Sequence, residues 1–261
     1  MFLSVEVTDF HNFSSPEYIY NFEVEQYKSK EENALNDLSD YLLDSSSTLD
    51  GDEIQKHLFP NKEVDIFLSH SHADADNVIR LAIALERKGL NVFIDSCVWG
   101  NAFDLLKDID NKYCYDSSTN TYSYEKRNRS TSHAYMMLNT ALHKMIDNCE
   151  VFLFLGTPNS VSVRQGIEDQ ELVNSPWILS ELALVQHIRR KTSYKQKLKS
   201  LTESLGMEAQ QPVMDSLDVA YTKPDLDHKI TSTALTNLLQ QNYSNKVDVF
   251  ERLYRHLNPW Y

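Results

Sequence analysis

One carboxylate in this sequence falls on the apolar face of a predicted helix. Ser175 is a typical N-cap residue and Pro176 suits the first helical position, which sets the register of the helix. At about 100° per residue, Glu181 lies in the same sector as Trp177 and Val185. Burying an unpaired carboxylate costs several kcal/mol. We therefore expect Glu181 to be a structural partner of a strand end or an arginine, to reach solvent at the helix rim, or to act chemically.

A second group of candidate residues is the run HSHAD at 70–74. Its two imidazoles and its carboxylate match the beginning of H-x-H-x-D-H, the zinc motif of metallo-β-lactamase-like hydrolases. Position 75 is alanine where that motif continues with histidine, and the upstream strands of such a fold are absent. A metal-dependent hydrolase that uses His70, His72 and Asp74 is therefore a minor alternative, and our main interpretation assigns no metal.

Short apolar runs predict the elements that must position these residues. The runs at 64–69, 91–95 and 150–156 are typical of buried strands, and helical periodicity follows at 75–89, at 133–148 and at 175–191. Strand, helix and strand in about thirty residues indicate a βαβ unit with parallel strands. We predict an α/β fold, a flavodoxin-like parallel sheet with ligand chemistry at the carboxyl ends of its strands.

The rest of the chain divides around this core. Residues 1–63 are predicted to be an N-terminal helical appendage, 64–225 the α/β domain, and 226–261 a C-terminal helical segment. Within the domain, residues from about 101 to 131 are polar and rich in tyrosine, which predicts a surface insertion that serves as a lid or an assembly surface.

Composition narrows the class of function. The 261 residues carry a formal net charge of −13, which argues against nucleic acid or an anionic membrane surface as a partner. We find neither a secretory signal nor an apolar run of about 20 residues. Three cysteines at irregular spacing argue against a disulfide framework and show no nucleophile signature. We expect a cytoplasmic protein.

Four separated blocks together resemble a known family. The stretches VDIFLSHSHAD, GLNVFID, CEVFLFLGTPNS and SPWILSEL occur in the order found in the Toll/interleukin-1 receptor (TIR) domain, especially in bacterial stand-alone TIR proteins of Thoeris-type anti-phage systems. The resemblance covers residues 64 to about 192. Trp177 and Glu181 match the W-x-x-x-E pair of catalytic members, in which the glutamate is required for cleavage of NAD+.

The resemblance implies an enzyme that cleaves the nicotinamide glycosidic bond of NAD+, with Glu181 as the catalytic residue. Water, a second nucleophile or the adenine of the same NAD+ would capture the ribosyl group and give ADP-ribose, a conjugate or a cyclic isomer. The implied role is an antiviral defence signal read by a downstream effector, with self-association through the TIR domain. NAD+ is the substrate, and no further cofactor is expected.

The strand ends supply the expected dinucleotide-binding residues. The first βα turn can hold the pyrophosphate, the loop after the second strand corresponds to the mobile BB loop of the family, and the third strand end can bond ribose hydroxyls. These candidates, with Trp177, are Ser69, His70, Ser71 and Asp74; Asp95 and Trp99; and Asn159 and Ser160. Trp99 is equally an ordinary packing aromatic, and Asn159 and Ser160 are equally turn formers.

Two departures and one rival interpretation remain. The loop after Asp95 lacks the proline-centred sequence of receptor TIR domains, so receptor-style adaptor pairing is not expected, and the insertion is longer than in many members. The rival interpretation is a non-catalytic TIR module that only assembles with partners, in which Glu181 is structural.

Overall fold

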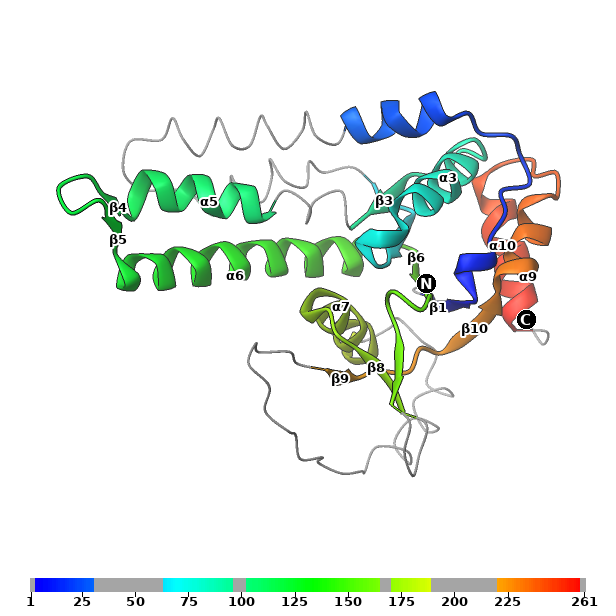
Figure 1. Cartoon of the computed structure of the whole chain (residues 1–261). Helices are drawn as coiled ribbons and strands as arrows, with labels where there is room; N and C mark the ends of the chain where they lie inside the picture. The colour runs from blue at the N-terminus through cyan, green and yellow to red at the C-terminus, as the bar shows by residue number, and fades with distance from the viewer. Residues whose placement is uncertain (1–2, 31–62, 96–101, 165–169, 189–219, 259–261) are drawn as a thin grey trace.

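A five-stranded parallel sheet forms the centre of the computed structural model, which describes residues 3–30, 63–95, 102–164, 170–188 and 220–258 (Figure 1). The strands lie in the order β10-β1-β6-β2-β3, and every neighbouring pair is parallel. Their bounds are β1 Leu3–Thr8, β2 Ile66–Ser69, β3 Val92–Ile94, β6 Val151–Leu155 and β10 His228–Thr231. The predicted α/β class with a parallel sheet is confirmed, and the arrangement is compatible with a flavodoxin-like fold.

The first strand of the sheet lies where a helical appendage was predicted. Residues 3–8 form β1, which pairs with β6 on one side and with β10 on the other. Leu3, Val5 and Val7 face the hydrophobic core, whereas Ser4 and Glu6 are buried on the opposite face. Because apolar and polar residues alternate along this buried strand, the sequence contains no continuous apolar run that would predict it. The predicted domain boundary at residue 63 is therefore wrong, because β1 lies before it and belongs to the central sheet.

The C-terminal segment needs a similar correction. Its two predicted helices are present as α9 (Ser232–Leu239) and α10 (Lys246–Leu257), but β10 precedes them and forms an edge of the sheet. Residues 226–258 of the predicted segment 226–261 are therefore part of the α/β layer rather than a helical addition to it.

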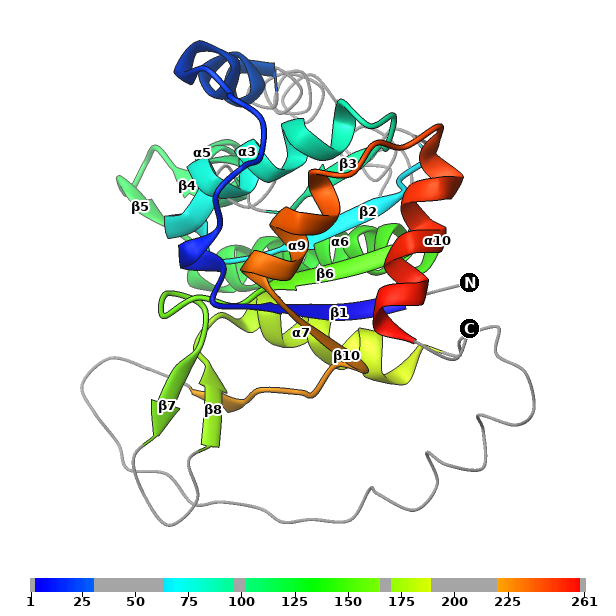
Figure 2. The ribbon, with the colours of Figure 1, turned by 90° about the vertical axis from the view of Figure 1, so that its right-hand side faces the viewer.

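Helices cover the two faces of the sheet in separate hydrophobic clusters. The first face packs against α3 (Ala75–Glu86), α9 and α10, and residues 21–30, which are helical, lie on the same side (Figure 2). The second face packs against α6 (Tyr124–Asn148) and α7 (Pro176–His187). Because side chains alternate along β2, Ile66 and Leu68 join the first cluster and Phe67 joins the second.

The segment predicted as a polar surface insertion is mostly helical. It consists of α5 (Ala102–Tyr113), a short hairpin of β4 (Tyr115–Asp116) and β5 (Thr121–Tyr122), and the start of the 25-residue helix α6. Figure 1 shows α5 running alongside α6, with the hairpin at the far end from the central sheet. Ser123 caps α6 by accepting a hydrogen bond from the amide of Lys126. Capping and long polar side chains make this sequence helical despite its loop-like composition.

A small antiparallel sheet and two 3-10 turns complete the described part of the chain. The sheet contains β7 (Ser162–Arg164), β8 (Gln170–Val173) and β9 (Tyr221–Thr222) in that order. The turns are η1 (Phe10–Asn12) after β1 and η2 (His72–Asp74) after β2. Among the helices that the structure describes, none has the length and apolar character needed to cross a membrane.

Candidate functional site

Glu181 lies on the buried face of α7, as helical periodicity predicted. The side chain of Ser175 accepts a hydrogen bond from the amide of Ile178, and Pro176 opens the helix. This start places Glu181, with no exposed surface, beside Leu182 on the face that packs against the sheet.

The carboxylate of Glu181 meets a hydroxyl at the carboxyl end of β2. Alternation along β2 turns Ser69 toward the α7 face, next to Phe154 of β6. The Ser69 hydroxyl donates to Oε2 of Glu181 at 2.5 Å, and Ser69 also has no exposed surface. A side-chain hydrogen bond contributes about 0.5–1.5 kcal/mol net, and leaving one of its buried partners unpaired costs about 1–3 kcal/mol. Ser69 therefore fixes the position of one carboxylate oxygen at the strand end.

A second buried pair links the ends of β2 and β3. Nδ1 of His70 lies 2.7 Å from Oδ1 of Asp95, and both side chains are almost completely buried. Both residues were predicted to contact a ligand directly. In the structure they contact each other, and this contact joins the carboxyl ends of β2 and β3.

Asp74 joins the loop after β2 to the loop after β6. Its carboxylate accepts hydrogen bonds from the hydroxyl of Thr157 at 2.6 Å and from the side-chain Nδ2 of Asn159 at 2.8 Å. His72, two residues earlier, is exposed, and His70 faces Asp95. The side chains of His70 and Asp74 thus have different partners, and His72 is exposed to solvent. No cluster of three or more potential metal ligands occurs within the residues that the structure describes.

Two of the predicted strand-end residues have local structural roles. The hydroxyl of Ser160 accepts a hydrogen bond from the amide of Thr157 at 2.9 Å and lies 3.3 Å from the carbonyl of Leu155. The backbone carbonyl of Ser71 accepts a hydrogen bond from the amide of Asp74. These contacts shape the loops after β6 and β2, in agreement with the turn-forming interpretation of Ser160.

Trp177 packs between the two helices of the second face. Its ring stacks on that of Tyr135 in α6, with centroids 5.2 Å apart and planes 28° from parallel. Deeper along the same interface, Nε2 of His143 lies 3.0 Å from the hydroxyl of Ser180, which donates to Asn139. Burial lowers the pKa of His143. Both contacts hold α7 against α6 and so fix the helix that carries Glu181. Trp99 lies outside the described residues.

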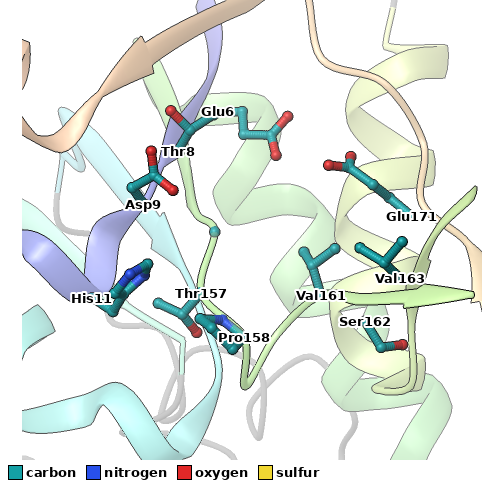
Figure 3. A pocket seen from close by; sticks show the side chains of 11 residues that line it. Glu6, Thr8, Asp9, His11, Thr157, Pro158, Val161, Ser162, Val163 and Glu171 are labelled. Atoms are coloured by element: carbon teal, nitrogen blue, oxygen red, sulfur yellow. The ribbon is translucent and has the colours of Figure 1, made fainter. Parts of the chain in front are cut away.

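A cavity that sequence reasoning missed opens at the carboxyl ends of β1 and β6. It has a volume of about 460 Å³ and includes side chains from β1, from the loop after β6 and from the β7–β8 hairpin (Figure 3). Glu6, Asp9 and Glu171 all line it. The available signal was Glu6, a carboxylate between Val5 and Val7, which is the same kind of anomaly as Glu181.

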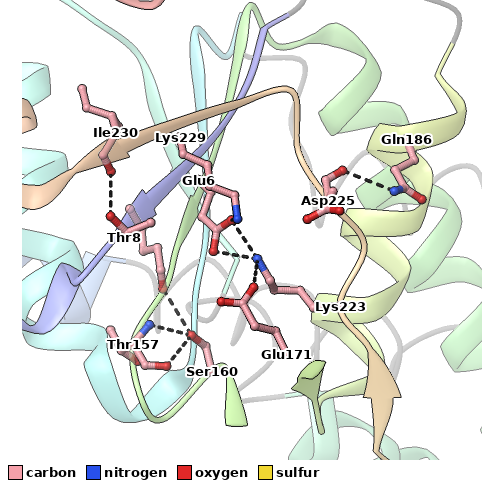
Figure 4. Close-up of polar contacts among 11 residues, drawn as sticks. Glu6, Thr8, Thr157, Ser160, Glu171, Gln186, Lys223, Asp225, Lys229 and Ile230 are labelled. Carbon is pink, nitrogen blue, oxygen red and sulfur yellow. Dashed lines mark hydrogen bonds and ion pairs between the residues drawn. The ribbon is translucent and has the colours of Figure 1, made fainter. Parts of the chain in front are cut away.

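Glu6 belongs to a buried ion-pair cluster beside this cavity. Nζ of Lys223 lies 2.7 Å from each carboxylate oxygen of Glu6 and 2.8 Å from Oε2 of Glu171 (Figure 4). Lys229 lies 3.3 Å from Oε2 of Glu6. The Lys223 hydrogen bond lowers the pKa of Glu171. The cluster covers the polar face of β1 with the segment that follows β9.

No protein-family model, curated protein or solved structure matches this chain.

Proposed function

We propose that this chain is a TIR-like enzyme that cleaves the bond between nicotinamide and ribose in NAD+, with Glu181 as the catalytic carboxylate. The observation that carries the proposal is the buried Glu181 carboxylate, which Ser69 holds at the carboxyl end of β2. Strand ends of this kind are where open α/β sheets bind nucleotides. A carboxylate that packing and a hydroxyl donor hold in place there is preorganised to stabilise a developing positive charge.

The chemistry needs one well-placed negative charge. Cationic nicotinamide is already a good leaving group, so bond breaking leaves positive charge on the ribosyl carbon. The carboxylate of Glu181 stabilises that oxocarbenium-like state or holds the ribose hydroxyls. Water or another nucleophile then forms the new bond to the ribosyl carbon, and nicotinamide leaves with the electron pair of the broken bond. In this scheme Ser69 is a positioning residue.

Burial sets a requirement on this mechanism. Glu181 and Ser69 have no exposed surface, so the ribose reaches the carboxylate only if the side chains above it move as the dinucleotide binds. Trp177 acts indirectly in this scheme, because its stacking on Tyr135 keeps α7 in register with α6. The ADP-ribose-derived product would serve as a signal in anti-phage defence.

Purified full-length protein incubated with NAD+ tests the proposal by mass spectrometry of released nicotinamide over a range of protein concentrations. Glu181→Gln should reduce turnover by at least about 100-fold, since it keeps the shape and removes the charge. Ser69→Ala should lower kcat by about tenfold with a smaller change in KM. Glu251→Gln, on the exposed surface of α10, is the matched control and should match the wild type.

Equal nicotinamide release by wild type and folded Glu181→Gln would remove Glu181 from the mechanism. Wild-type protein that never consumes NAD+, even when concentrated, would favour the second candidate, a non-catalytic assembly module. The observation that favours this candidate is the α5–α6 arm, which carries the exposed side chains of Tyr124 and Met136. Light scattering of the same samples would then detect oligomers without turnover.

A further inference from the structure

The strand order creates two crevices at the carboxyl edge of the sheet. The chain leaves β1 and β2 toward the first face, since Phe10 after β1 and α3 after β2 belong to one hydrophobic cluster. It leaves β6 toward the second face, where α7 packs. Neighbouring strands that exit to opposite faces leave a crevice between their ends. Because β6 lies between β1 and β2, such crevices occur at β2/β6 and at β1/β6.

The two crevices hold different groups. Ser69 and Glu181 are buried at the β2/β6 strand ends and carry the proposed NAD+ chemistry. The β1/β6 crevice contains the cavity of about 460 Å³, which lies within the size range of small-molecule sites, about 300–1,000 Å³. Gly156 contributes to its lining, and a Cβ there would lie 3.5 Å from the carboxylate of Glu6. Neither Ser69 nor Glu181 lines the β1/β6 cavity.

The lining of the β1/β6 cavity favours a positive charge. Figure 3 shows the carboxylates of Glu6, Asp9 and Glu171 around it, and none of its lining residues is a lysine or an arginine. Lys223, from outside the lining, bonds both Glu6 and Glu171. Asp9 is exposed just after β1, and its side chain makes no ion pair or hydrogen bond with the other residues that the structure describes. Because Lys223 and Lys229 offset the charges of Glu6 and Glu171, the negative charge that a ligand meets is chiefly that of Asp9, and this charge disfavours an anion.

Apolar side chains form part of the lining of the cavity beside Glu171 and Ser162. Pro158, Val161 and Val163 line it from the loop after β6 and from β7. An aliphatic chain can pack against these side chains while a charged end approaches Asp9. The combination of an apolar wall and an uncompensated carboxylate matches an alkylammonium ion better than a sugar or a phosphate.

We propose that the β1/β6 cavity binds a small molecule with a protonated amine on an aliphatic stem. Asp9 holds the ammonium group, and Val161 and Val163 contact the stem. The site does not depend on the NAD+ reaction, so either proposal can fail while the other holds.

Calorimetric titration of the full-length protein with 1,4-diaminobutane tests the proposal against two probes with the same four-carbon chain. The neutral probe is 1,4-butanediol and the anionic probe is succinate. The diamine should bind saturably with one molecule per chain and more weakly at high salt, because its charge is screened. Neither 1,4-butanediol nor succinate should show saturable binding.

Two variants locate the binding site. Asp9→Asn should weaken diamine binding by about threefold or more, and asparagine tolerates the left-handed backbone that Asp9 adopts at φ 55. Val163→Lys places a cation at an exposed position of the lining and should weaken binding by about tenfold. Glu251→Gln removes one charge from α10 as a control and should bind like the wild type.

Some results would overturn the proposal. One is the absence of saturable diamine binding by the wild-type protein, and another is equal binding of the diamine and succinate. A third is wild-type affinity for the diamine in both Asp9→Asn and Val163→Lys, each shown to be folded. Urea unfolding of each variant establishes that it is folded, so that a loss of affinity is assigned to the cavity.

Discussion

Replacing Lys223 by methionine should destabilise the fold by about 3 kcal/mol. The ammonium group of Lys223 lies 2.7 Å from both oxygens of Glu6, and the two side chains are only 1% and 4% exposed. Removing one partner of a buried pair leaves an uncompensated charge and costs about 3–5 kcal/mol. We expect the lower end, because Lys229 remains 3.3 Å from Glu6 and is half-exposed.

Replacing both partners tests whether the loss of stability comes from the ion pair itself. In the double variant Glu6→Gln with Lys223→Met, no buried charge is left alone, so the combined loss should be smaller than the sum of the two single losses. Glu171 loses its cation in the same variant, but its side chain is 45% exposed and can return to water. The result also tests whether β1 belongs to the core, since the pair joins residues 217 positions apart.

Urea unfolding followed by circular dichroism measures these free energies. A loss of about 3 kcal/mol corresponds to a fall in Tm of about 6–12 °C for a chain of this size. Arg255→Met is the control, because Arg255 and Glu251 form an exposed pair at 3.5 Å and the change should cost less than about 0.5 kcal/mol. A loss below about 1 kcal/mol in Lys223→Met, or strict additivity in the double variant, would refute the reasoning.

Three further predictions follow from buried polar groups. Burial raises the pKa of Asp110, but hydrogen bonds from Ser130 and Arg127 outweigh it and hold the pKa below its ordinary value of 3.8. This contribution to stability is present above that value and is lost as the pH falls through the native pKa, so the destabilisation measured for Arg127→Leu should shrink in acid. Asp74→Ala should lower the free energy of unfolding by about 1–2 kcal/mol in urea titrations, since it removes both side-chain hydrogen bonds to the loop after β6. Burial raises the pKa of Cys149, so peptide mapping after alkylation near neutral pH should find this thiol unmodified until the protein unfolds.

Local patterns in the sequence predicted the parts of the molecule that depend on backbone periodicity. The runs at 64–69, 91–95 and 150–156 contain β2, β3 and β6, and the helical wheel correctly placed Glu181 on the buried face of α7. Periods of 3.6 and 2.0 follow from backbone geometry, so neighbouring residues are sufficient to detect them. The strand β1 escaped because its buried positions include the polar residues Ser4 and Glu6, and β10 escaped because Ile230 is its only buried residue.

The partners of the buried polar groups were decided only by the tertiary structure. Ser69 meets Glu181 across 112 positions of the chain, and Glu6 meets Lys223 across 217. Each carboxylate was visible in the sequence as an anomaly, but nothing local identifies its partner. Strand order and helix packing choose that partner, because a buried charge is stabilised only by groups that the folded chain brings within hydrogen-bond distance. The same strand order places β1 beside β6 and so creates the cavity between their ends.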